Sequence, residues 1–401
     1  MARLSRIGVY TDLVFRRDAD GVLSTDLSFV LFVAALARHV DEVVFFGRLD
    51  PVPGRSPYAL PSEKIRLVPF PHYERLTSVG RVAGSLRGAH AAVAGELDRL
   101  DALWLFGPHP LALDFARLAR RRGTPVFLGI RQDLPQYIAG RLPSKAWLWA
   151  VPCAHALEHA FRRLARRVPT VVVGHALARA YAQSGGPLLE IAVSLVRDDD
   201  LVPVEEAVAR PWDGELRLLS IGRLESEKNP LLLPEILAAL RARDPRWRLV
   251  AVGSGDLTEA VEARARELGV ADAFERHGYV PFGDPLWELY RTSNAFLHVS
   301  LTEGVPQVLL EAEAAGLPIV ATDVGGVGAA LEGGRLGLLI PPRDSDAAVA
   351  ALERLRDDPA LRRRLTEQGL ASVAGKTLEA ELGRVLAFFE AQFLEARLGA
   401  S

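Results

Sequence analysis

The feature that most constrains the fold of this chain is a pattern of apolar runs and helical stretches that begins twice. In the first half, the runs typical of strands are Arg6–Tyr10, Val43–Phe46, Ile65–Pro69, Ala102–Phe106, Pro125–Ile130 and Thr170–Val173. Helical stretches such as Asp26–Val40 and Leu111–Arg122 separate them. Continuous apolar strands favour a parallel sheet covered by helices on both faces. We therefore predict a doubly wound α/β domain, which binds ligands at the carboxyl ends of its strands.

The same pattern restarts in the second half of the chain. The strands expected there are Leu216–Ile221, Leu249–Val252, Ala295–Val299 and Ile319–Thr322, with helices such as Pro230–Arg241 and Leu257–Leu268 between them. The intervening segment Arg197–Pro211 has no periodicity and is the predicted linker. We therefore expect one Rossmann-like domain over residues 1–205 and a second over residues 206–376. The terminal segment Thr377–Leu398 repeats apolar residues at helical spacing and is predicted to pack as a helix.

Composition limits the class of protein. With 401 residues, 49% of them hydrophobic, the chain is too long for one ordinary core. A single cysteine, Cys153, excludes an intrachain disulfide framework and a cysteine-built zinc site. The longest apolar stretch, Leu27–Leu36, is too short to span a bilayer, and no secretory signal is readable at the N-terminus. A cytoplasmic location is therefore expected.

Charge is distributed unequally between the two halves. Residues 1–200 contain 26 Lys+Arg and 19 Asp+Glu, whereas residues 201–401 contain 22 and 31. A basic first half suits an anionic acceptor or an anionic lipid surface, and arginine-rich solvated helix faces are the simpler explanation.

A pair of cations follows the first strand of the second half. In LLSIGRLESEKNP, Gly222 lets the chain turn, and Arg223 and Lys228 come just before a predicted helix. A helix N-terminus, a guanidinium fork and an ammonium charge together favour a diphosphate ligand. The alternative is a surface pair that serves Glu225 and Glu227.

Two carboxylates follow further along the chain. Glu303 is expected to open a helix, and Glu311 comes eight residues later, about 12 Å along the same helix face. One carboxylate could accept hydroxyl hydrogen bonds from a sugar and the other from a ribose, with free N–H groups meeting phosphate oxygens between them. The alternative is a Glu favoured by the helix dipole and an ordinary exposed Glu311.

These motifs carry a family resemblance. GRLESEK, then VGSGDL, RHGYV, EGVPQVLLE and ATDVGG, resemble the retaining glycosyltransferases of family 4, also called glycosyl transferase group 1, most strongly over residues 214–345. The resemblance implies the GT-B fold: two facing Rossmann-like doubly wound domains with a cleft between them, and a terminal helix, about residues 377–401, that returns to the first domain. It also implies a retaining transfer from a nucleotide-diphosphate sugar, such as a UDP-sugar, to an acceptor hydroxyl. No cofactor and no divalent metal are expected.

The resemblance also assigns roles to residues. Arg223 and Lys228 would hold the donor diphosphate, Glu303 the donor sugar and Glu311 the ribose hydroxyls. Further donor contacts are expected at Gly253, Gly255, Tyr279, Val280, Gly304, Val305 and Gln307. No metal site is predicted, because the run Asp198–Asp200 lies in the linker and is better explained as a solvated acidic turn.

The chain departs from the family at three places, two of them in the first half and one in the second. The family's Gly-Gly loop after the first strand is replaced by TDLVFRRDADG, which brings in Arg16 and Arg17. The nearest candidates for a first-domain histidine are His109 in FGPHP, which could orient the acceptor or form a simple turn, and the cluster Arg131–Asp133. His109 is kept as a candidate catalytic residue. The Glu that usually follows ATDVGG is absent.

The motifs also fit two other functions. The same fold and carboxylates suit a sugar-nucleotide 2-epimerase or a non-catalytic nucleotide-sugar binding protein. The nucleotide base, the sugar and the acceptor, whether small molecule, glycan or lipid, are not determined, and no nucleic-acid partner is expected. Trp147 and Trp149, near the cluster Arg162–Arg167, suggest peripheral contact with the inner membrane face or a place in the core.

Overall fold

A computed structural model describes residues 4–60, 63–71, 79–139, 145–304 and 306–398. The chain forms two compact units, one of Met1–Val193 with Glu381–Ser401 and one of Ser194–Ala380. The first unit thus ends earlier than the predicted residue 205. The reason is that Val202 already belongs to the second unit, where its N–H donates to the carbonyl of Ala314 and its side chain packs with Leu370.

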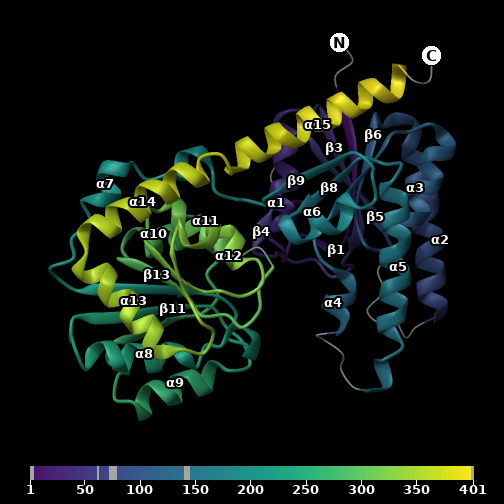
Figure 1. Ribbon diagram of the computed structural model, residues 1–401. Coiled ribbons are helices and arrows are strands. Elements are labelled where there is room, and N and C mark those ends of the chain that lie inside the picture. The colour runs from purple at the N-terminus through teal and green to yellow at the C-terminus, as the bar shows by residue number, and fades with distance from the viewer. Residues whose placement is uncertain (1–3, 61–62, 72–78, 140–144, 305, 399–401) are drawn as a thin grey trace. The chain divides into compact units, whose positions relative to one another are not determined.

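The sheet of the first unit is largely parallel (Figure 1). Its strands are β1 (Arg6–Arg17), β2 (Leu23–Thr25), β3 (Glu42–Leu49), β4 (Tyr58–Ala59), β5 (Ile65–Phe70), β6 (Ala102–Gly107), β7 (Val126–Ile130), β8 (Thr170–Val173) and β9 (Leu188–Ile191). The parallel strands run in the order β5-β3-β1-β6-β7-β8-β9, and β2 and β4 extend β1 in antiparallel pairing. The chain order reverses between β1 and β6, and such a switch point is where doubly wound sheets bind ligands.

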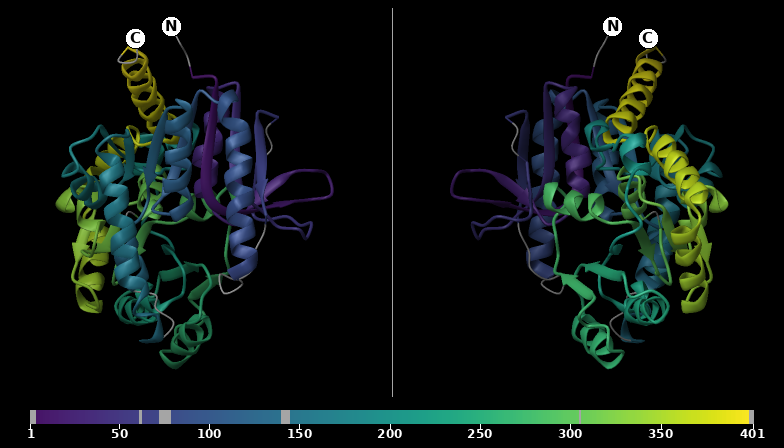
Figure 2. Two further views of the ribbon diagram at one scale, coloured as in Figure 1. Left: turned by 90° about the vertical axis from the view of Figure 1, so that its right-hand side faces the viewer. Right: turned by 90° about the vertical axis from the view of Figure 1, so that its left-hand side faces the viewer.

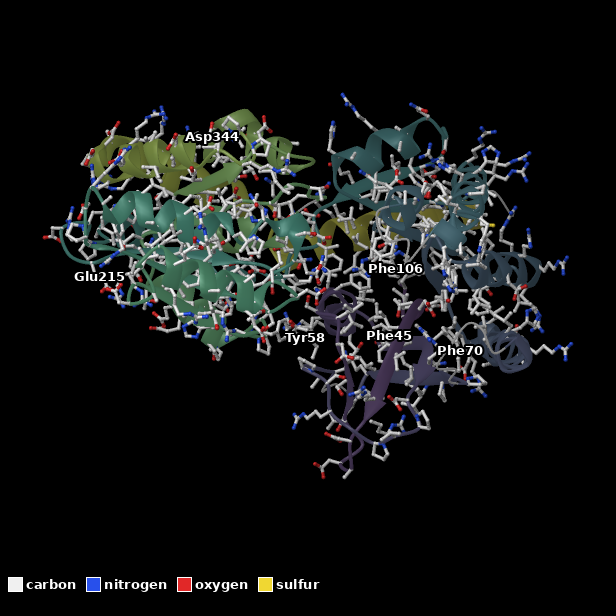
Figure 3. The ribbon with its side chains drawn as sticks, turned by 90° about the horizontal axis from the view of Figure 1, so that it is seen from below. Phe45, Tyr58, Phe70, Phe106, Glu215 and Asp344 are labelled. Atoms are coloured by element: carbon white, nitrogen blue, oxygen red, sulfur yellow. The ribbon has the colours of Figure 1, made fainter. Side chains whose placement is uncertain are left out.

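Helices pack on this sheet through apolar faces. They are α1 (Phe29–Ala34), α2 (Val79–Glu96), α3 (Pro110–Arg122), α4 (Leu134–Ala139), α5 (Ala150–Ala165) and α6 (His175–Ala182), with short 3-10 turns at Ala35–Arg38, Leu97–Arg99 and Lys145–Trp147. Phe45, Phe70 and Phe106 lie inside the unit (Figure 3). The last helix, α15 (Leu378–Leu398), supplies Phe389, whose ring stacks on Phe127 with a centroid distance of 3.9 Å.

Strand β1 is longer than the sequence pattern predicts. Instead of ending at Tyr10 it continues to Arg17, after a register shift against β3 between Tyr10 and Val14. Its far end forms a hairpin with β2, which projects from the parallel part of the sheet in Figure 2. The segment that replaces the family's Gly-Gly loop is therefore extended backbone rather than a tight turn.

The second unit contains a fully parallel sheet. Its strands are β10 (Leu216–Ile221), β11 (Trp247–Val252), β12 (Phe274–His277), β13 (Ala295–His298), β14 (Ile319–Thr322) and β15 (Leu338–Ile340). Their order is β12-β11-β10-β13-β14-β15, which is the order of dinucleotide-binding sheets. Its switch point lies between β10 and β13.

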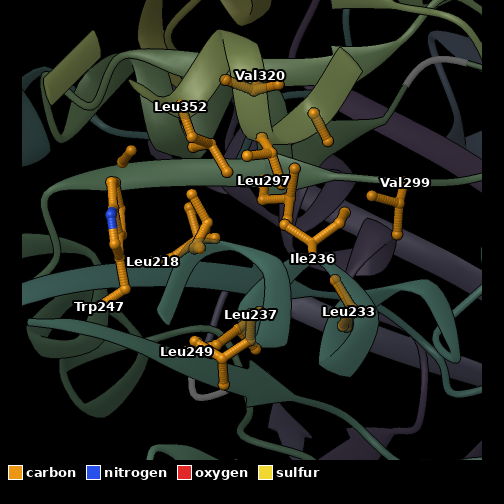
Figure 4. Close-up of a cluster of buried hydrophobic side chains, with 14 of the residues drawn as sticks. Leu218, Leu233, Ile236, Leu237, Trp247, Leu249, Leu297, Val299, Val320 and Leu352 are labelled. Atoms are coloured by element: carbon orange, nitrogen blue, oxygen red, sulfur yellow. The ribbon is translucent and has the colours of Figure 1, made fainter. Parts of the chain in front are cut away.

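Helices cover this second sheet too. They are α7 (Val204–Val208), α8 (Leu232–Arg241), α9 (Thr258–Glu267), α10 (Asp284–Arg291), α11 (Gln307–Ala314), α12 (Val327–Ala330), α13 (Ser345–Asp357) and α14 (Pro359–Val373), with 3-10 turns at Asp198–Asp200, Ser226–Lys228 and Glu332–Gly334. Leu218 of β10 and Ile236 of α8 lie in the core between sheet and helices (Figure 4). Each such fully buried side chain contributes about 1.5–3 kcal/mol, so this core fixes the strand ends that carry the candidate site.

Two other sequence features can be placed. The run Asp198–Asp200 forms a 3-10 turn in which the N–H of Arg197 donates to the Asp200 carboxylate.

Trp147 and Trp149 are not in the core: their side chains are exposed and their rings stack with a centroid distance of 5.6 Å. In the part of the chain that the structure describes, no helix has the length and apolarity needed to span a membrane.

Candidate functional site

The switch point of the second sheet collects the charged residues that the sequence singles out. Arg223 and Lys228 follow the carboxyl end of β10, and Glu303 follows the carboxyl end of β13. A small hollow lies at this edge, and its polar lining includes Arg223, Lys228, His298 and Ser300. Segments 75 residues apart in the sequence therefore meet where such a sheet is expected to hold a ligand.

Glu303 is the centre of this cluster. Its Oε1 forms an ion pair with the Nζ of Lys228 and accepts a hydrogen bond of 2.8 Å from the Ser300 hydroxyl. The Nε2 of His298, a buried residue, lies 3.0 Å from the same oxygen. One carboxylate oxygen thus holds together a lysine, a histidine and a serine.

This cluster keeps Glu303 ionised. Burial opposes ionisation, but the interactions with His298 and Lys228 outweigh it and lower the pKa of Glu303 to about 2. The site therefore contains a carboxylate, paired with Lys228, that stays ionised throughout the physiological pH range.

The loop that carries Glu303 is held by its neighbours. The Leu301 N–H donates to the Glu227 carbonyl, and the Gly326 N–H donates to the Glu303 carbonyl. Gly325 has a φ of +55°, and a Cβ at this position would lie 2.0 Å from the Glu303 carbonyl oxygen. The loop after β14 can approach that closely because Gly325 has no side chain.

Glu303 does not open a helix, contrary to the sequence prediction. Helix α11 begins at Gln307, after Pro306, so Glu303 lies in the loop before it. Pro306 itself has an extended backbone with a ψ of 112°, so the helix starts only at the next residue. The predicted spacing of the two carboxylates along one helix face is therefore wrong, although Glu311 does lie on α11.

Arg223 contacts the two glutamates that the alternative interpretation, a surface ion pair, assigns to it. Its guanidinium forms ion pairs with both Glu225 and Glu227. The arginine side chain is 46% exposed, and ion pairs of this kind typically contribute about 0–1 kcal/mol. An incoming anion therefore competes with weakly held carboxylates, which leaves Arg223 available for a ligand.

Glu311 is buried rather than exposed. It accepts a hydrogen bond of 2.7 Å from the hydroxyl of Tyr290, which is itself fully buried on α10. Burial raises the pKa of Glu311 to about 7, against the lowering effect of the Tyr290 hydrogen bond. Near neutral pH this carboxyl is therefore close to half protonated.

The two glycines of VGSGDL have a structural reason to be glycines. Gly253 has a φ of +134°, and a Cβ there would lie 2.0 Å from the Gly222 carbonyl oxygen. A Cβ at Gly255 would lie 2.5 Å from the carbonyl oxygen of Leu224. Both glycines thus let the turn after β11 pack against the turn that carries Arg223.

The remaining predicted donor contacts are more exposed. Tyr279 is 57% exposed and Val280 is half-buried, both just after β12, while Gly304 is exposed in the loop of Glu303. Gln307 is the first residue of α11. Val305 lies outside the described residues.

The first unit has its own polar cluster at its switch point. His109 follows β6, and its Nδ1 lies 2.7 Å from the hydroxyl of Tyr10 on β1. The Leu111 N–H also donates to this Nδ1, so Nδ1 is the unprotonated nitrogen and the tyrosine is the donor. The Nε2 lies 3.5 Å from the Asp12 carboxylate, which in turn lies 3.4 Å from Arg48.

This environment favours a neutral imidazole. Burial lowers the pKa of His109, the charge of Arg48 lowers it further, and the charge of Asp12 acts in the opposite direction. With Nδ1 accepting two hydrogen bonds, the neutral ring carries its proton on Nε2. His109 is therefore held in one tautomer while it caps the N-terminus of α3.

The second candidate in the first unit is differently placed. Arg131 follows β7 with its guanidinium 3.3 Å from the centroid of the Phe29 ring, and burial lowers its pKa to about 10. Asp133 accepts a hydrogen bond from the Gln136 N–H at the start of α4. Both residues therefore have local structural roles.

Three residues of the site are missing from the sequence prediction. His298 and Ser300 contact Glu303, and Tyr290 contacts Glu311. The available signal was a histidine at the end of an otherwise apolar strand, which a buried strand seldom contains without a partner.

The chain has two Rossmann-like units, and the second has a cation pair and carboxylates at its switch point. This is the architecture of the GT-B glycosyltransferases. Residues 205–371 match the family model described as glycosyl transferases group 1. The chain therefore carries a glycosyl transferases group 1 domain over these residues.

Curated relatives and solved structures agree with this domain and fold. A glycogen synthase of Mycobacterium tuberculosis (strain CDC 1551 / Oshkosh) is 35% identical over 158 residues, which cover 39% of this chain and 38% of the relative. A D-inositol 3-phosphate glycosyltransferase of Frankia alni is 38% identical over 172 residues, 41% of this chain and 42% of the relative. The chain thus spans about two fifths of the length of each relative.

The whole fold has a counterpart in HepE of Anabaena, solved in complex with UDP. The TM-score is 0.70 at 14% identity, covering 97% of this chain and 100% of that chain. At this identity the likeness concerns the fold, and it confirms the predicted GT-B class.

Proposed function

We propose that this protein is a retaining glycosyltransferase that moves a sugar from a nucleoside diphosphate donor to an acceptor hydroxyl without a divalent metal. The observation that carries the proposal is the cluster of Lys228, His298 and Glu303, with Arg223 beside it, at the switch point of a group 1 domain. A similar fold that was solved with UDP supports a nucleoside diphosphate donor. The relatives' names include different acceptors, so the acceptor is proposed as a hydroxyl compound only.

The proposed transfer uses the charged side chains of the site to stabilise the leaving diphosphate and to hold the donor sugar. The bond between the anomeric carbon and the leaving phosphate oxygen breaks, and the acceptor oxygen bonds to the same face of the sugar. The acceptor proton passes to the leaving phosphate oxygen, so no covalent enzyme intermediate is required. Arg223 and Lys228 stabilise the negative charge that develops on the departing diphosphate, which is the task a metal would otherwise perform. Glu303, held ionised, accepts hydroxyl hydrogen bonds from the donor sugar.

The test is turnover of a nucleotide sugar in the presence of EDTA. A panel of nucleoside diphosphate sugars is incubated with the protein and hydroxyl acceptors, and released nucleoside diphosphate and the anomeric configuration of the product are measured by NMR. We expect transfer with retention and the same rate with or without EDTA. Inversion, or a rate that EDTA abolishes, contradicts the proposed mechanism, and an epimer formed from the donor alone indicates an epimerase instead.

The pKa of Glu311 predicts how donor affinity depends on pH. If the ionised carboxylate accepts the ribose hydroxyls, protonation of this group, whose pKa is about 7, competes with binding. Affinity for a nucleoside diphosphate sugar should then fall by about tenfold between pH 8 and pH 6. Calorimetric titration at several pH values measures this change, because the two phosphates of a nucleotide sugar do not titrate in that range.

The matched control is Glu311→Gln, which keeps the side-chain size but cannot ionise. This variant should bind the donor more weakly at pH 8 and show little dependence on pH. A wild-type affinity that stays constant between pH 6 and pH 8, or a variant with the same pH dependence, would exclude Glu311 from the ribose contact.

His109 is proposed to orient the acceptor. Replacing it with phenylalanine removes both ring nitrogens and should lower kcat by about 10- to 100-fold, while donor affinity stays unchanged because the donor residues lie in the other unit. Tyr10→Phe removes a donor to Nδ1 and should have a smaller effect in the same direction. Kinetics with both substrates varied measures this; a loss of donor affinity in H109F, or unchanged kcat, argues against the role.

A further inference from the structure

A second basic site lies in the first unit, where residues of α3 and α5 line one hollow. Figure 1 labels both helices. These two helices enclose a hollow of about 320 Å³. Part of its lining consists of small and apolar side chains, which are Leu113, Ala116, Ala160 and Leu164. Its charged lining consists of five arginines, which are Arg117, Arg120, Arg163, Arg166 and Arg167, and we call this hollow the arginine groove.

Among the residues that the structure describes, the five arginines have no carboxylate partner. Each is exposed, and none forms an ion pair with any residue that the structure describes. Their neighbours on the same helices differ: Arg122 pairs with Asp98 at 3.2 Å, and Arg162 pairs with the buried Glu158 at 3.1 Å. The lining of the groove contains no carboxylate.

The helix geometry concentrates these charges. Arg117 and Arg120 are three residues apart on α3 and share a face of that helix, whereas Arg163 lies in the last turn of α5 and Arg166 and Arg167 follow its last residue, Ala165. Like charges gathered at such short spacings repel one another. The groove thus collects unbalanced positive charge that an anion would neutralise.

We propose that the arginine groove binds a soluble ligand that carries two or more phosphate groups. Planar guanidinium groups match phosphate oxygens in bidentate hydrogen bonds, and two facing rows can hold two phosphates at once. The inference does not depend on the proposed glycosyl transfer. The groove lies toward the C-terminal ends of α3 and α5, which lead into the amino ends of β7 and β8, and this is the sheet edge opposite to that of Tyr10 and His109.

The groove suits a soluble ligand better than a lipid surface. Binding to a bilayer combines basic residues with exposed aromatic and aliphatic side chains that enter it. The large exposed apolar residues of this region are Trp147, Leu148 and Trp149, at the other end of α5. Since α5 has 16 residues, they lie about 24 Å from the arginines at a rise of 1.5 Å per residue.

The test is calorimetric titration with inorganic tripolyphosphate on the full chain carrying Arg223→Ala and Lys228→Met, so that the second unit's cations do not contribute. In this background we expect one tripolyphosphate per chain. Adding R163Q and R167Q should weaken binding by about tenfold or more, because each guanidinium supplies charge-assisted hydrogen bonds. The matched control adds R99Q and R121Q, which remove two exposed positive charges outside the groove and should change affinity by less than about twofold.

Three results would overturn the proposal. The first is absence of tripolyphosphate binding at low salt. The second is equal weakening by the groove pair and the control pair, which indicates non-specific attraction to the net charge. The third is co-sedimentation with phosphatidylglycerol vesicles that depends on Arg163 and Arg167 and is not displaced by tripolyphosphate, which assigns the groove to a lipid surface.

Discussion

Replacing Lys228 with methionine is expected to lower kcat/KM for glycosyl transfer by about 10²- to 10³-fold. Methionine has nearly the same length and volume, so the change removes charge rather than packing. Two effects combine. The departing diphosphate loses a fixed cation, and Glu303 loses the ammonium group that helps to keep its pKa near 2. Steady-state kinetics measures the loss, and calorimetry measures the weaker binding of the nucleoside diphosphate without any acceptor.

The matched control for this variant is Lys64→Met in the first unit. Lys64 is an exposed lysine whose Nζ donates to the Val40 carbonyl, far along the chain from the donor residues. Its replacement should leave kcat/KM and donor affinity within about twofold of wild type. If K228M transfers sugar as fast as K64M, Lys228 does not stabilise the leaving group.

Replacing Gly325 with alanine is expected to displace the loop that carries Glu303, although Gly325 itself is not a proposed donor contact. The backbone at Gly325 has a φ of +55°, and the new Cβ would clash with the Glu303 carbonyl oxygen at 2.0 Å. The loop after β14 must then move away from the loop of Glu303. We expect a loss of about 2–4 kcal/mol in the free energy of unfolding, from backbone strain and lost contact. We also expect about a 10²-fold loss in kcat/KM, because small displacements of positioning groups are costly.

Denaturant unfolding and steady-state kinetics measure these two losses. Gly214→Ala is the control, since a Cβ at Gly214 meets no atom within 4 Å. That variant should stay within about 0.5 kcal/mol of wild type and keep its activity. A G325A protein with wild-type stability and turnover would show that the close approach of the two loops does not position Glu303.

The sequence pattern predicts the sheets well, because their central strands are continuous apolar runs. The predicted strand Leu216–Ile221 is confirmed as β10, and the repeated αβ pattern is confirmed as two parallel sheets. The strands that it misses are short ones outside the central pairs, such as β9 (Leu188–Ile191), β12 and β15. Each of these strands has four residues or fewer and is only partly buried, so periodicity carries little signal there.

The site is less predictable, because its geometry depends on loops. The residue types of Arg223, Lys228 and Glu303 indicate anion and hydroxyl chemistry, but their pairing does not follow from the sequence. The contact between Lys228 and Glu303 requires β10 and β13 to be neighbours and the Glu303 loop to be fixed by Gly325. Likewise, nothing local to Glu311 shows that it is buried against Tyr290 from another helix.

The first unit departs from the family where its β1 strand continues beyond Tyr10. That extension places Asp12 beside His109 and Arg48, a network that a Gly-Gly turn would not provide. Asp12, the ionic partner of His109, therefore lies on the part of β1 that extends beyond Tyr10, whereas the hydrogen-bonded partners of His109 lie outside this extension. The acceptor side of the proposed reaction should depend on this network.

The central claim is that the switch point of the second unit holds a nucleoside diphosphate, and direct titration tests it. Uridine, guanosine and adenosine diphosphates are titrated calorimetrically into the full chain in EDTA, and then into K228M and Glu311→Ala. We predict that at least one of them binds with one site per chain and that both variants weaken it by about tenfold or more. Absence of binding by all three, or an affinity that neither substitution changes, would contradict the assignment of the site.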